Sequence, residues 1–475
     1  MPWQSSSRQP SSGALSNNRM EHDFHDTANN PESGAGRSGE AGKLFRQALA
    51  QGLIREEDTL LIFHDLDRLE SRIRGLVQAF PEGSLHAVAV KANPLLRVLE
   101  RVQATDPATG AEAASVGEVT LALKAGFTPD RIVFDSPVKT REDLLFAISK
   151  GIHVNIDNLD ELARIATLTG WGDPDGVGGP RQGGGTPTGW GSFGLRVNPQ
   201  VGTGSIAGSS VAGTWSKFGV PIGHRRRELE DAFMRFPWLT GVHLHVGSQG
   251  CPVDMLVRGV GILYDFVMEM NPRRTAAGLP PISLFDIGGG LPISYRADAS
   301  PPSMEAYAHE LKSRAPALFR PGTFRLITEF GRWVFTNSGW TVSRVEYVKR
   351  DPGINTAMIH CGADLFVREC LNPSDWQHEY SLLDPAGFSR SGTDEATYTL
   401  AGPLCFSGDI LARNVPLPRV NEGDYLVIHD TGGYTFSMWS RYNSRQTPRI
   451  LGWQNSRFTL LKERETLNDL QQFWE

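Results

Sequence analysis

HAVAVKANP, residues 86–94, is the stretch that decides the fold. Its apolar half predicts a short strand that closes on Lys91, and Ala-Asn-Pro then ends the strand before a helical segment at 95–103. Outward from it the same alternation recurs, with strands predicted at 60–63, 131–134, 153–156, 194–197, 241–245 and 283–287, and helices at 68–80, 116–125, 142–150, 159–169 and 254–270. Alternation of this length predicts parallel strands joined by crossover helices in an α/β fold, with a (β/α)8 TIM-like barrel as the expected closure.

The alternation of predicted strands and helices ends after about residue 325. Short β-rich runs at 340–348, 397–400, 424–429 and 458–461 follow one another without long helices between them. This pattern is typical of a mostly antiparallel β domain. We therefore expect four parts, a disordered N-terminal tail at 1–40, a barrel at 41–325, a Gly-rich insertion within it at 171–191, and a C-terminal β domain at 326–475.

Composition narrows the class of protein. The chain has 475 residues, enough for a barrel plus a second domain, and its net charge of −6 argues against nucleic-acid binding. Four widely spaced cysteines without a CxxC pair indicate a reduced chain rather than a disulfide framework. No apolar run is long enough to cross a membrane, and the N-terminus has no signal-peptide core. A cytoplasmic enzyme acting on a small molecule is the expectation.

Lys91 is the first candidate for chemistry. Burial at a strand exit disfavours the ammonium, so the amine can lose its proton and attack an aldehyde to form a Schiff base. Most lysines near strand ends are merely solvated, so the case for a chemical role of Lys91 depends on four later motifs. These are HLHVGS at 243–248, DIGGG at 286–290, EFGR at 329–332 and GPLCFSGD at 402–409.

Each later motif also has an ordinary structural interpretation. His243, directed into the barrel, is better explained alone as a hydrogen-bonded core residue, and the three glycines can serve only a tight turn. Glu329 and Arg332 can form an exposed ion pair that contributes little. Cys405 can be a small buried hydrophobe. Their combination and order argue for chemistry instead.

Taken together over about residues 60–450, these motifs resemble the alanine-racemase-like (fold type III) pyridoxal-phosphate enzymes, in particular the ornithine/diaminopimelate decarboxylase branch. The resemblance implies that Lys91 carries pyridoxal 5'-phosphate as an aldimine and that an amino acid loses CO2 through a quinonoid intermediate. Residues implied to bind the cofactor are Lys91, Arg196, His245, Ser248, Gly288, Gly289, Gly290, Glu329, Arg332 and Tyr434, with Glu112 near the ring substituents. No metal is implied.

Three of these residues have specific roles in the resemblance. His245 stacks on the pyridine ring, Glu329 keeps the ring nitrogen protonated, and Arg332 pairs with the phosphate. In the related racemases an arginine faces that nitrogen, so Glu329 favours decarboxylation. Cys405 comes from a partner subunit and helps to protonate the carbon after CO2 leaves, which implies a homodimer with shared active sites.

The sequence departs from the family in the expected substrate site, which comprises Arg368, Phe406 and Asp409. Diaminopimelate and ornithine decarboxylases place an acid directly after the cysteine, where it receives the substrate's distal ammonium. Phe406 cannot pair that charge. Arg368 matches an arginine that holds a distal carboxylate, so we expect a substrate with a distal carboxylate and no free ammonium, as in siderophore-precursor decarboxylases.

Three other functions stay open from the sequence. Diaminopimelate decarboxylase itself is opposed mainly by Phe406. A metal-dependent barrel hydrolase can use His-x-His at 243–245 as zinc ligands, but it leaves the glycines and Arg332 unexplained. A catalytically inactive regulatory homologue is opposed by the presence of both Lys91 and Cys405.

Overall fold

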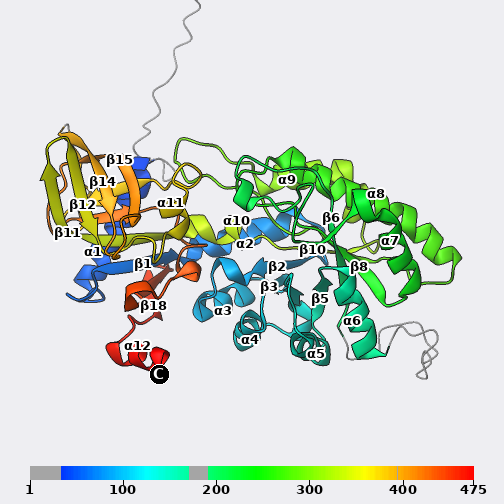
Figure 1. The fold of residues 1–475 in the computed structure, drawn as a ribbon. Helices are drawn as coiled ribbons and strands as arrows, with labels where there is room; N and C mark the ends of the chain where they lie inside the picture. The colour runs from blue at the N-terminus through cyan, green and yellow to red at the C-terminus, as the bar shows by residue number, and fades with distance from the viewer. Residues whose placement is uncertain (1–33, 171–190, 393) are drawn as a thin grey trace, which may run out of the picture.

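The computed structural model describes residues 34–170, 191–392 and 394–475, which form two nine-stranded sheets. One sheet closes into a parallel barrel and the other forms a separate β domain beside it (Figure 1). The predicted α/β barrel with a second, mostly antiparallel β domain is confirmed.

Eight parallel strands make the barrel, and β10 pairs with β2 to close it. The strands are β2 (Leu85–Ala89), β3 (Thr109–Ala113), β4 (Ile132–Asp135), β5 (His153–Ile156), β6 (Phe193–Asn198), β8 (Leu239–His243), β9 (Leu284–Asp286) and β10 (Arg325–Thr328). A two-residue strand, β7 (Val220–Pro221), adds to the edge of β6. Because barrel strands are covered on both faces, they read as continuous buried runs rather than alternating ones.

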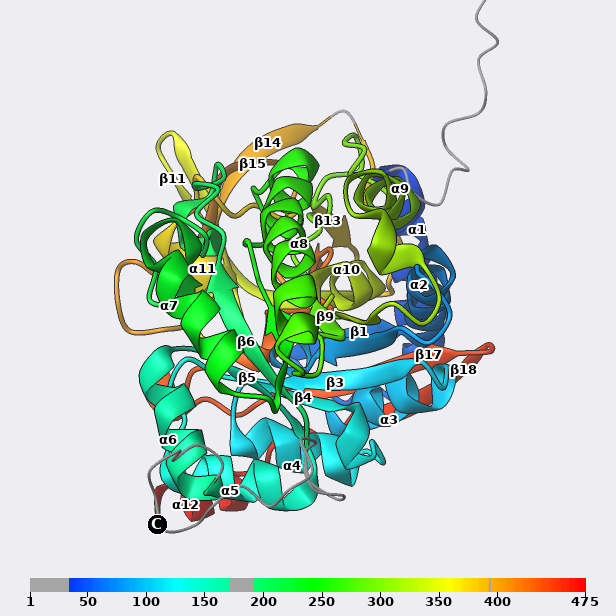
Figure 2. The ribbon, with the colours of Figure 1, turned by 90° about the vertical axis from the view of Figure 1, so that its right-hand side faces the viewer.

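Helices cover the outside of the barrel strands, as Figure 2 shows. They are α2 (Leu66–Ala79), α3 (Leu96–Thr105), α4 (Val116–Lys124), α5 (Arg141–Lys150), α6 (Leu159–Thr169), α7 (Ile222–Arg235), α8 (Val253–Ala276) and α9 (Met304–Arg314). Local sequence fixes several of their starts. Thr140 and Asp143 form a capping box at α5, and Ser115 and Asn158 cap α4 and α6.

The β domain contains one strand that the sequence assigned elsewhere. Its strands are β1 (Leu60–Asp65), β11 (Gly339–Asp351), β12 (Ile354–Ile359), β13 (Tyr380–Leu383), β14 (Glu395–Ala401), β15 (Ile410–Pro418), β16 (Tyr425–Ile428), β17 (Arg449–Gln454) and β18 (Arg457–Lys462). β1 pairs with β11 and β17, so the prediction that residues 60–63 belong to the barrel is wrong. An apolar run of this length reads alike in either sheet, and only long-range pairing decides between them.

The predicted boundaries shift at both ends of the barrel. The helix α1 (Gly34–Ala50) packs on the β domain through Leu44 and Phe45, so residues 34–40 are helical rather than a tail. β10 completes the barrel and extends it past residue 325. The remaining tail and nearly all of the Gly-rich insertion, 1–33 and 171–190, lie outside the described residues.

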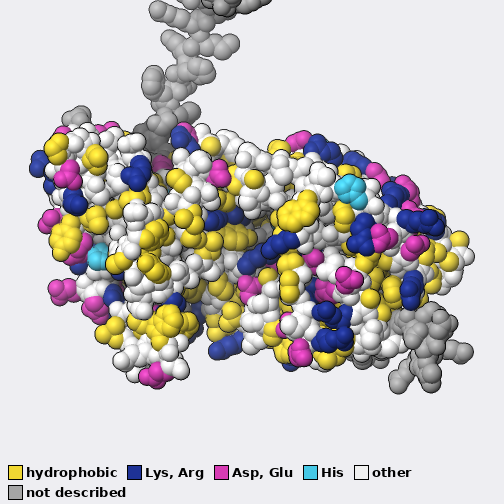
Figure 3. Space-filling model, viewed as in Figure 1, with side chains coloured by type: hydrophobic (Ala, Val, Ile, Leu, Met, Phe, Trp, Pro, Cys, Tyr) yellow, Lys and Arg dark blue, Asp and Glu magenta, His cyan; other side chains and the backbone are white. Residues whose placement is uncertain are grey.

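Acidic and basic side chains are interspersed over the face in Figure 3, and apolar side chains gather over the C-terminal helix α12 (Leu467–Trp474). No helix among the described residues is long and apolar enough to span a membrane. The barrel end that faces the β domain holds the pocket described next.

Candidate active site

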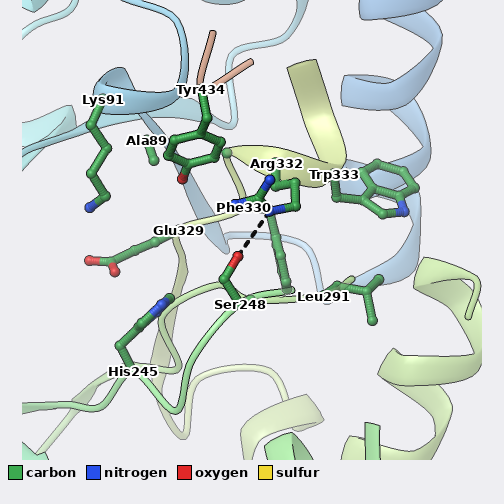
Figure 4. A pocket seen from close by; sticks show the side chains of 12 residues that line it. Ala89, Lys91, His245, Ser248, Leu291, Glu329, Phe330, Arg332, Trp333 and Tyr434 are labelled. Atoms are coloured by element: carbon green, nitrogen blue, oxygen red, sulfur yellow. Dashed lines mark hydrogen bonds between the residues drawn. The ribbon is translucent and has the colours of Figure 1, made fainter. Parts of the chain in front are cut away.

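A pocket lies where the ends of barrel strands meet a loop of the β domain (Figure 4). Its lining includes seven predicted site residues from distant parts of the chain, which are Lys91, His245, Ser248, Gly290, Glu329 and Arg332 with Tyr434 from the β domain. The remaining lining residues are Ala89, Leu291, Phe330, Gly331 and Trp333. The pocket therefore depends on both sheets being in place.

Lys91 lies in a short turn, η2 (Val90–Ala92), directly after β2. Its Nζ donates to both carboxylate oxygens of Glu112, at 2.7 and 2.6 Å, and the Lys91 side chain is 42% exposed while Glu112 is fully buried. Burial acts to lower the pKa of Lys91, but the adjacent Glu112, with Tyr434 and Glu329, outweighs it and raises the pKa. The direction of the Lys91 pKa shift is therefore opposite to the predicted one, because the contact with Glu112 outweighs burial.

Glu112 thus has a clearer position than the sequence suggested. It lies on β3 opposite the end of β2, and burial raises its pKa even though Lys91 is in contact with it. An ammonium must lose a proton before it attacks a carbonyl, and Glu112 is the acceptor in contact with Nζ. This geometry makes Glu112 a candidate to hold the proton that Lys91 releases.

His245 follows the end of β8, and its ring faces the pocket near Glu329 in Figure 4. Its Nδ1 accepts the backbone N–H of Gly289 at 3.1 Å, which leaves the hydrogen on Nε2. Burial, helped by Arg196 and Lys91, holds its pKa well below the usual value. The ring is therefore neutral, as a residue that packs on a flat aromatic ligand requires, and its stacking role stays a prediction.

Glu329 and Arg332 do not form the exposed ion pair of the ordinary interpretation, because both are buried. Burial, followed by the charges of Glu112 and Asp135, raises the pKa of Glu329 well above its usual value. Arg332 Nε donates to Ser248 Oγ at 3.0 Å, the contact dashed in Figure 4. One end of the pocket is thus acidic and the other basic.

The basic end is built around the Arg332 guanidinium. It lies 4.5 Å from the centre of the Tyr434 ring and 5.0 Å from that of Trp376, and it donates to the hydroxyl of Tyr295. Trp376 and Tyr295 were not predicted, and isolated aromatic residues carry no signal of such a role in a single sequence. These contacts fix a guanidinium whose remaining donors suit a phosphate.

The three glycines have a packing reason of their own. A Cβ on Gly288, Gly289 or Gly290 would lie 2.4, 2.4 or 2.0 Å from a backbone oxygen of a neighbouring loop. Gly288 and Gly290 also have φ values of 63° and 107°, which favour glycine. Gly290 lines the pocket, while the predicted contact of all three with a phosphate stays a prediction.

Arg196 is directed inside the barrel, where it pairs with an acid that sequence reasoning missed. Its Nη1 lies 3.2 and 2.9 Å from the two oxygens of Asp135, the last residue of β4. Burial opposes ionisation of Asp135, but Arg196, with His243 and Lys91, holds its pKa low. A charged residue that ends a predicted barrel strand is the signal that could have identified Asp135.

The three predicted substrate residues, Arg368, Asp409 and Phe406, lie in different places in the structure. Arg368 lies near the basic end, where it donates to the Tyr434 carbonyl at 2.7 Å and stacks 4.2 Å from the centre of the Trp376 ring. Asp409 is buried away from the pocket and accepts the backbone N–H groups of Ala363 and Leu404, both at 2.6 Å. Both carboxylate oxygens hold a turn of the β domain, and the substrate role of Asp409 stays a prediction.

Cys405 and Phe406 are exposed on the β domain and do not line the pocket as described for one chain. Phe406 is 39% exposed and packs edge-on against Tyr442, with ring centres 6.2 Å apart. The carbonyl of Cys405 accepts from the Tyr442 hydroxyl at 3.4 Å.

A metal centre was an alternative, and one cluster of side chains has the residue types and spacing of metal ligands. Single ligand atoms of Asp135, His243 and Glu329 lie within 4.8 Å of one another. However, both oxygens of Asp135 already face the Arg196 guanidinium, which would repel a divalent cation. His245, the second histidine of the motif, is not in the cluster.

Comparison with known proteins identifies the family. The pyridoxal-binding domain of pyridoxal-dependent decarboxylases matches residues 66–336. This chain belongs to the pyridoxal-dependent decarboxylases. Its relatives include a diaminopimelate decarboxylase of Methanothermobacter thermautotrophicus, 30% identical over 90% of this chain and 94% of the relative, and one of Pseudomonas fluorescens, 30% identical over 85% and 90%.

Solved structures agree on the fold. The structure of diaminopimelate decarboxylase from Helicobacter pylori complexed with L-lysine has a TM-score of 0.74 at 24% identity, and the match covers 90% of this chain and 99% of that one. Lysine/ornithine decarboxylase from Vibrio vulnificus complexed with putrescine gives 0.68 at 20% identity. Both share the barrel and β domain.

The family settles the cofactor and the class of reaction. This decarboxylase uses pyridoxal phosphate, which when bound supplies an aldehyde for the amine of an amino acid and a ring that accepts the electrons left as CO2 departs. The pocket fits that group, with an amine at Lys91, an acid at Glu329, and Arg332, Ser248 and Tyr434 at the basic end. Membership of this enzyme family replaces the two alternatives of a metal-dependent hydrolase and a catalytically inactive homologue.

Proposed function

We propose that this decarboxylase removes CO2 from a dicarboxylic L-amino acid in the pocket between barrel and β domain. The observation that carries the proposal is the arrangement of groups along one pocket, with Lys91 and Glu329 at one end, Arg332 and Ser248 at the other, and Glu112 in contact with the Lys91 amine. Lys91 holds the cofactor through its amine, and Glu112 takes the proton that the amine gives up. Glu329 holds a proton at the ring nitrogen.

The basic end and the histidine orient the cofactor. Arg332, Ser248, Tyr434 and Gly290 bind the phosphate, since their donors converge on one side of the pocket. His245 covers one face of the ring and excludes water from it, in keeping with its neutral state. Arg196 lies next to the ring substituents and keeps Asp135 ionised.

Diaminopimelate is the first candidate substrate. The curated relatives named above are diaminopimelate decarboxylases, and they match along nearly their whole length. Arg368 stands beside the phosphate end, and its Nε is buried without a hydrogen-bond partner among the described residues. A guanidinium with a free donor at this position supports recognition of a distal carboxylate.

A second candidate is favoured by Phe406. A phenyl ring replaces the acid that meets a distal ammonium in the resembling enzymes, and it leaves such a charge unpaired. A substrate with a distal carboxylate but an acylated or absent distal amine avoids that penalty. Siderophore-precursor conjugates have this chemistry.

The active site is completed by a second copy of the chain. Cys405 and Phe406 are exposed and lie outside their own pocket, and both contact another exposed aromatic residue, Tyr442. Burying these exposed side chains against a second copy removes apolar area from water. In the homodimer, Cys405 of one subunit gives a proton to the substrate carbon in the other.

The first experiment records the visible spectrum of the purified protein with pyridoxal phosphate, before and after borohydride. A band that borohydride removes, and that is absent from Lys91→Ala but present in Lys124→Ala, supports the proposal; Lys124 is an exposed lysine outside the pocket. CO2 release is then measured with diaminopimelate, lysine, ornithine and an N-acylated diaminopimelate. A protein that binds no cofactor, or that releases CO2 equally with Lys91→Ala, would refute it.

A further inference from the structure

His243 is a buried residue with a function still to be found. It ends β8 and is completely inaccessible, yet neither ring nitrogen has a hydrogen bond of ordinary geometry among the described residues. Both nitrogens face carboxylates instead, Nδ1 at 3.8 Å from Asp135 Oδ1 and Nε2 at 3.4 Å from Glu329 Oε2. The ordinary interpretation of a satisfied core histidine is therefore wrong.

Two acceptors around one imidazole restrict where its hydrogens lie. A carboxylate oxygen attracts a ring nitrogen that carries hydrogen and repels one that presents a lone pair. Asp135 is held as an anion by Arg196, so Nδ1 keeps its hydrogen toward Asp135. The second contact is then attractive only when one proton is shared between Nε2 and Glu329 Oε2.

Strand register holds this arrangement in place. His243 is the register partner of Arg196 on β6 and of Asp286 on β9. Asn155 on β5 donates to Asp286 at 3.0 Å and to Glu329 at 3.4 Å.

Other charged groups face the ring from neighbouring elements. Asp286, Arg196 and Glu112 lie close enough to influence the His243 charge, and burial lowers its pKa despite the acids around it. After burial, the charge of Glu329 raises the pKa of Asp286 further, whereas a hydrogen bond with Asp286 lowers the pKa of Glu329, which burial, Glu112 and Asp135 raise. The cluster therefore holds more carboxyl groups than fixed cations, and a proton shared inside it lowers their mutual repulsion.

We propose that His243 is a positioning residue that holds the proton and the orientation of Glu329, with Asp135 fixing the tautomer of His243. When Glu329 is ionised, the shared proton lies on Nε2 of His243. When Nε2 accepts a hydrogen bond instead, the proton lies on Oε2 of Glu329, and the total charge of the pair is the same in both cases. The inference rests on the proposed function, in which Glu329 meets the cofactor's ring nitrogen. His243 itself never touches substrate.

The test compares His243→Gln with His243→Met in the cofactor-bound enzyme. Both side chains have similar reach, but only Gln retains a donor for Glu329. Loss of the shared-proton contact with Glu329, taken as equivalent to one hydrogen bond to a charged group, predicts that Met lowers kcat roughly 10- to 100-fold with KM nearly unchanged, while Gln recovers most of that loss. His429→Gln, a buried histidine of the β domain bonded to Ser381, is the matched control.

A double-variant cycle shows whether His243 acts through Glu329. In a Glu329→Gln background, the change from His243 to Met should have little further effect on kcat. The pH dependence of the visible band and pyridoxal phosphate affinity, measured by tryptophan fluorescence, should shift with Met and not with the control. Thermal unfolding of the cofactor-free variants checks folding, and if Met does not fold, His243→Leu, which also lacks a donor, replaces it in the band and affinity measurements.

Some results would overturn the inference alone. Equal kcat for Gln and Met, or an equal effect of Met with and without Glu329, would show that His243 only fills space. An unshifted band in the variant that folds would have the same meaning. Wild-type protein that binds no pyridoxal phosphate would instead overturn the proposed function, and this inference with it.

Discussion

Lys139 offers a sharp test of how a buried charge stabilises the loop between β4 and α5. Its ammonium is fully buried, and Nζ donates to the carbonyls of Ser136 and Asn155 and to Glu161 Oε1, at 2.7, 2.8 and 2.8 Å. Glu161 in turn accepts the backbone N–H of Asp157 at 3.0 Å. Replacing Lys139 by Met keeps the length of the side chain and removes all three bonds.

The expected loss follows from these contacts. Breaking a buried ion pair by removing one partner costs about 3–5 kcal/mol, because Glu161 is left as an unpaired buried charge. For a domain of this size, that loss lowers the thermal midpoint on the order of 5–10 °C. Calorimetry of the cofactor-free protein measures it without stabilisation from the cofactor.

The double variant Lys139→Met with Glu161→Gln separates charge from packing. With both charges removed, more than half of the lost stability should return. Lys124→Met, at an exposed lysine, is the control and should leave the midpoint within about 1 °C. If the double variant is as unstable as Lys139→Met alone, the unpaired charge is not the cause and the reasoning is refuted.

Three further predictions address the site and its environment. Phe406→Glu should raise kcat/KM for diaminopimelate relative to its N-acylated form about tenfold, because a buried carboxylate then meets the distal ammonium. Leu467→Glu, at another exposed position, is the control. An unchanged ratio of the two kcat/KM values would place residue 406 away from the substrate. Arg332→Lys should weaken pyridoxal phosphate binding about tenfold or more, since an ammonium cannot keep the contacts with Ser248 and the Tyr434 ring, and an unchanged dissociation constant in a fluorescence titration would contradict this. Burial lowers the pKa of four histidines, His64, His86, His153 and His429, from 6.5 to about 4. Between these two pH values the unfolded chain therefore binds more protons than the folded chain. The thermal midpoint should fall as the pH is lowered from 6.5 to about 4. His429→Gln should make that fall shallower, and a midpoint independent of pH there would contradict the assignment of neutral buried histidines.

The local pattern of the chain was informative wherever neighbours in sequence decide the outcome. The predicted helices at 116–125 and 159–169 match α4 and α6 closely, because their caps and apolar faces are encoded within a few residues. The predicted helix at 254–270 is longer in the structure, where α8 continues to Ala276 past Pro272. Helix ends depend on what packs against them, so they are less well determined by the sequence.

The candidate site divides in the same way. Lys91, His245, Ser248, Glu329 and Arg332 carried motifs strong enough to be named before the fold was known, and they do meet in one pocket. Motifs could not indicate which charges face one another. Asp135, Asp286 and Asn155 acquire their importance only when β4, β9 and β5 turn them toward the same interior.

The sequence by itself determined the alternation of strands and helices, the lysine at a strand exit and the glycines that allow close backbone approach, since each depends on local sterics and periodicity. Tertiary structure alone decided that β1 joins the β domain, that Glu112 raises the pKa of Lys91, and that Asp409 holds a turn of the β domain. The physical reason is that strand pairing, burial and charge all depend on neighbours distant in the chain. A side chain's chemistry follows from those neighbours once the barrel closes.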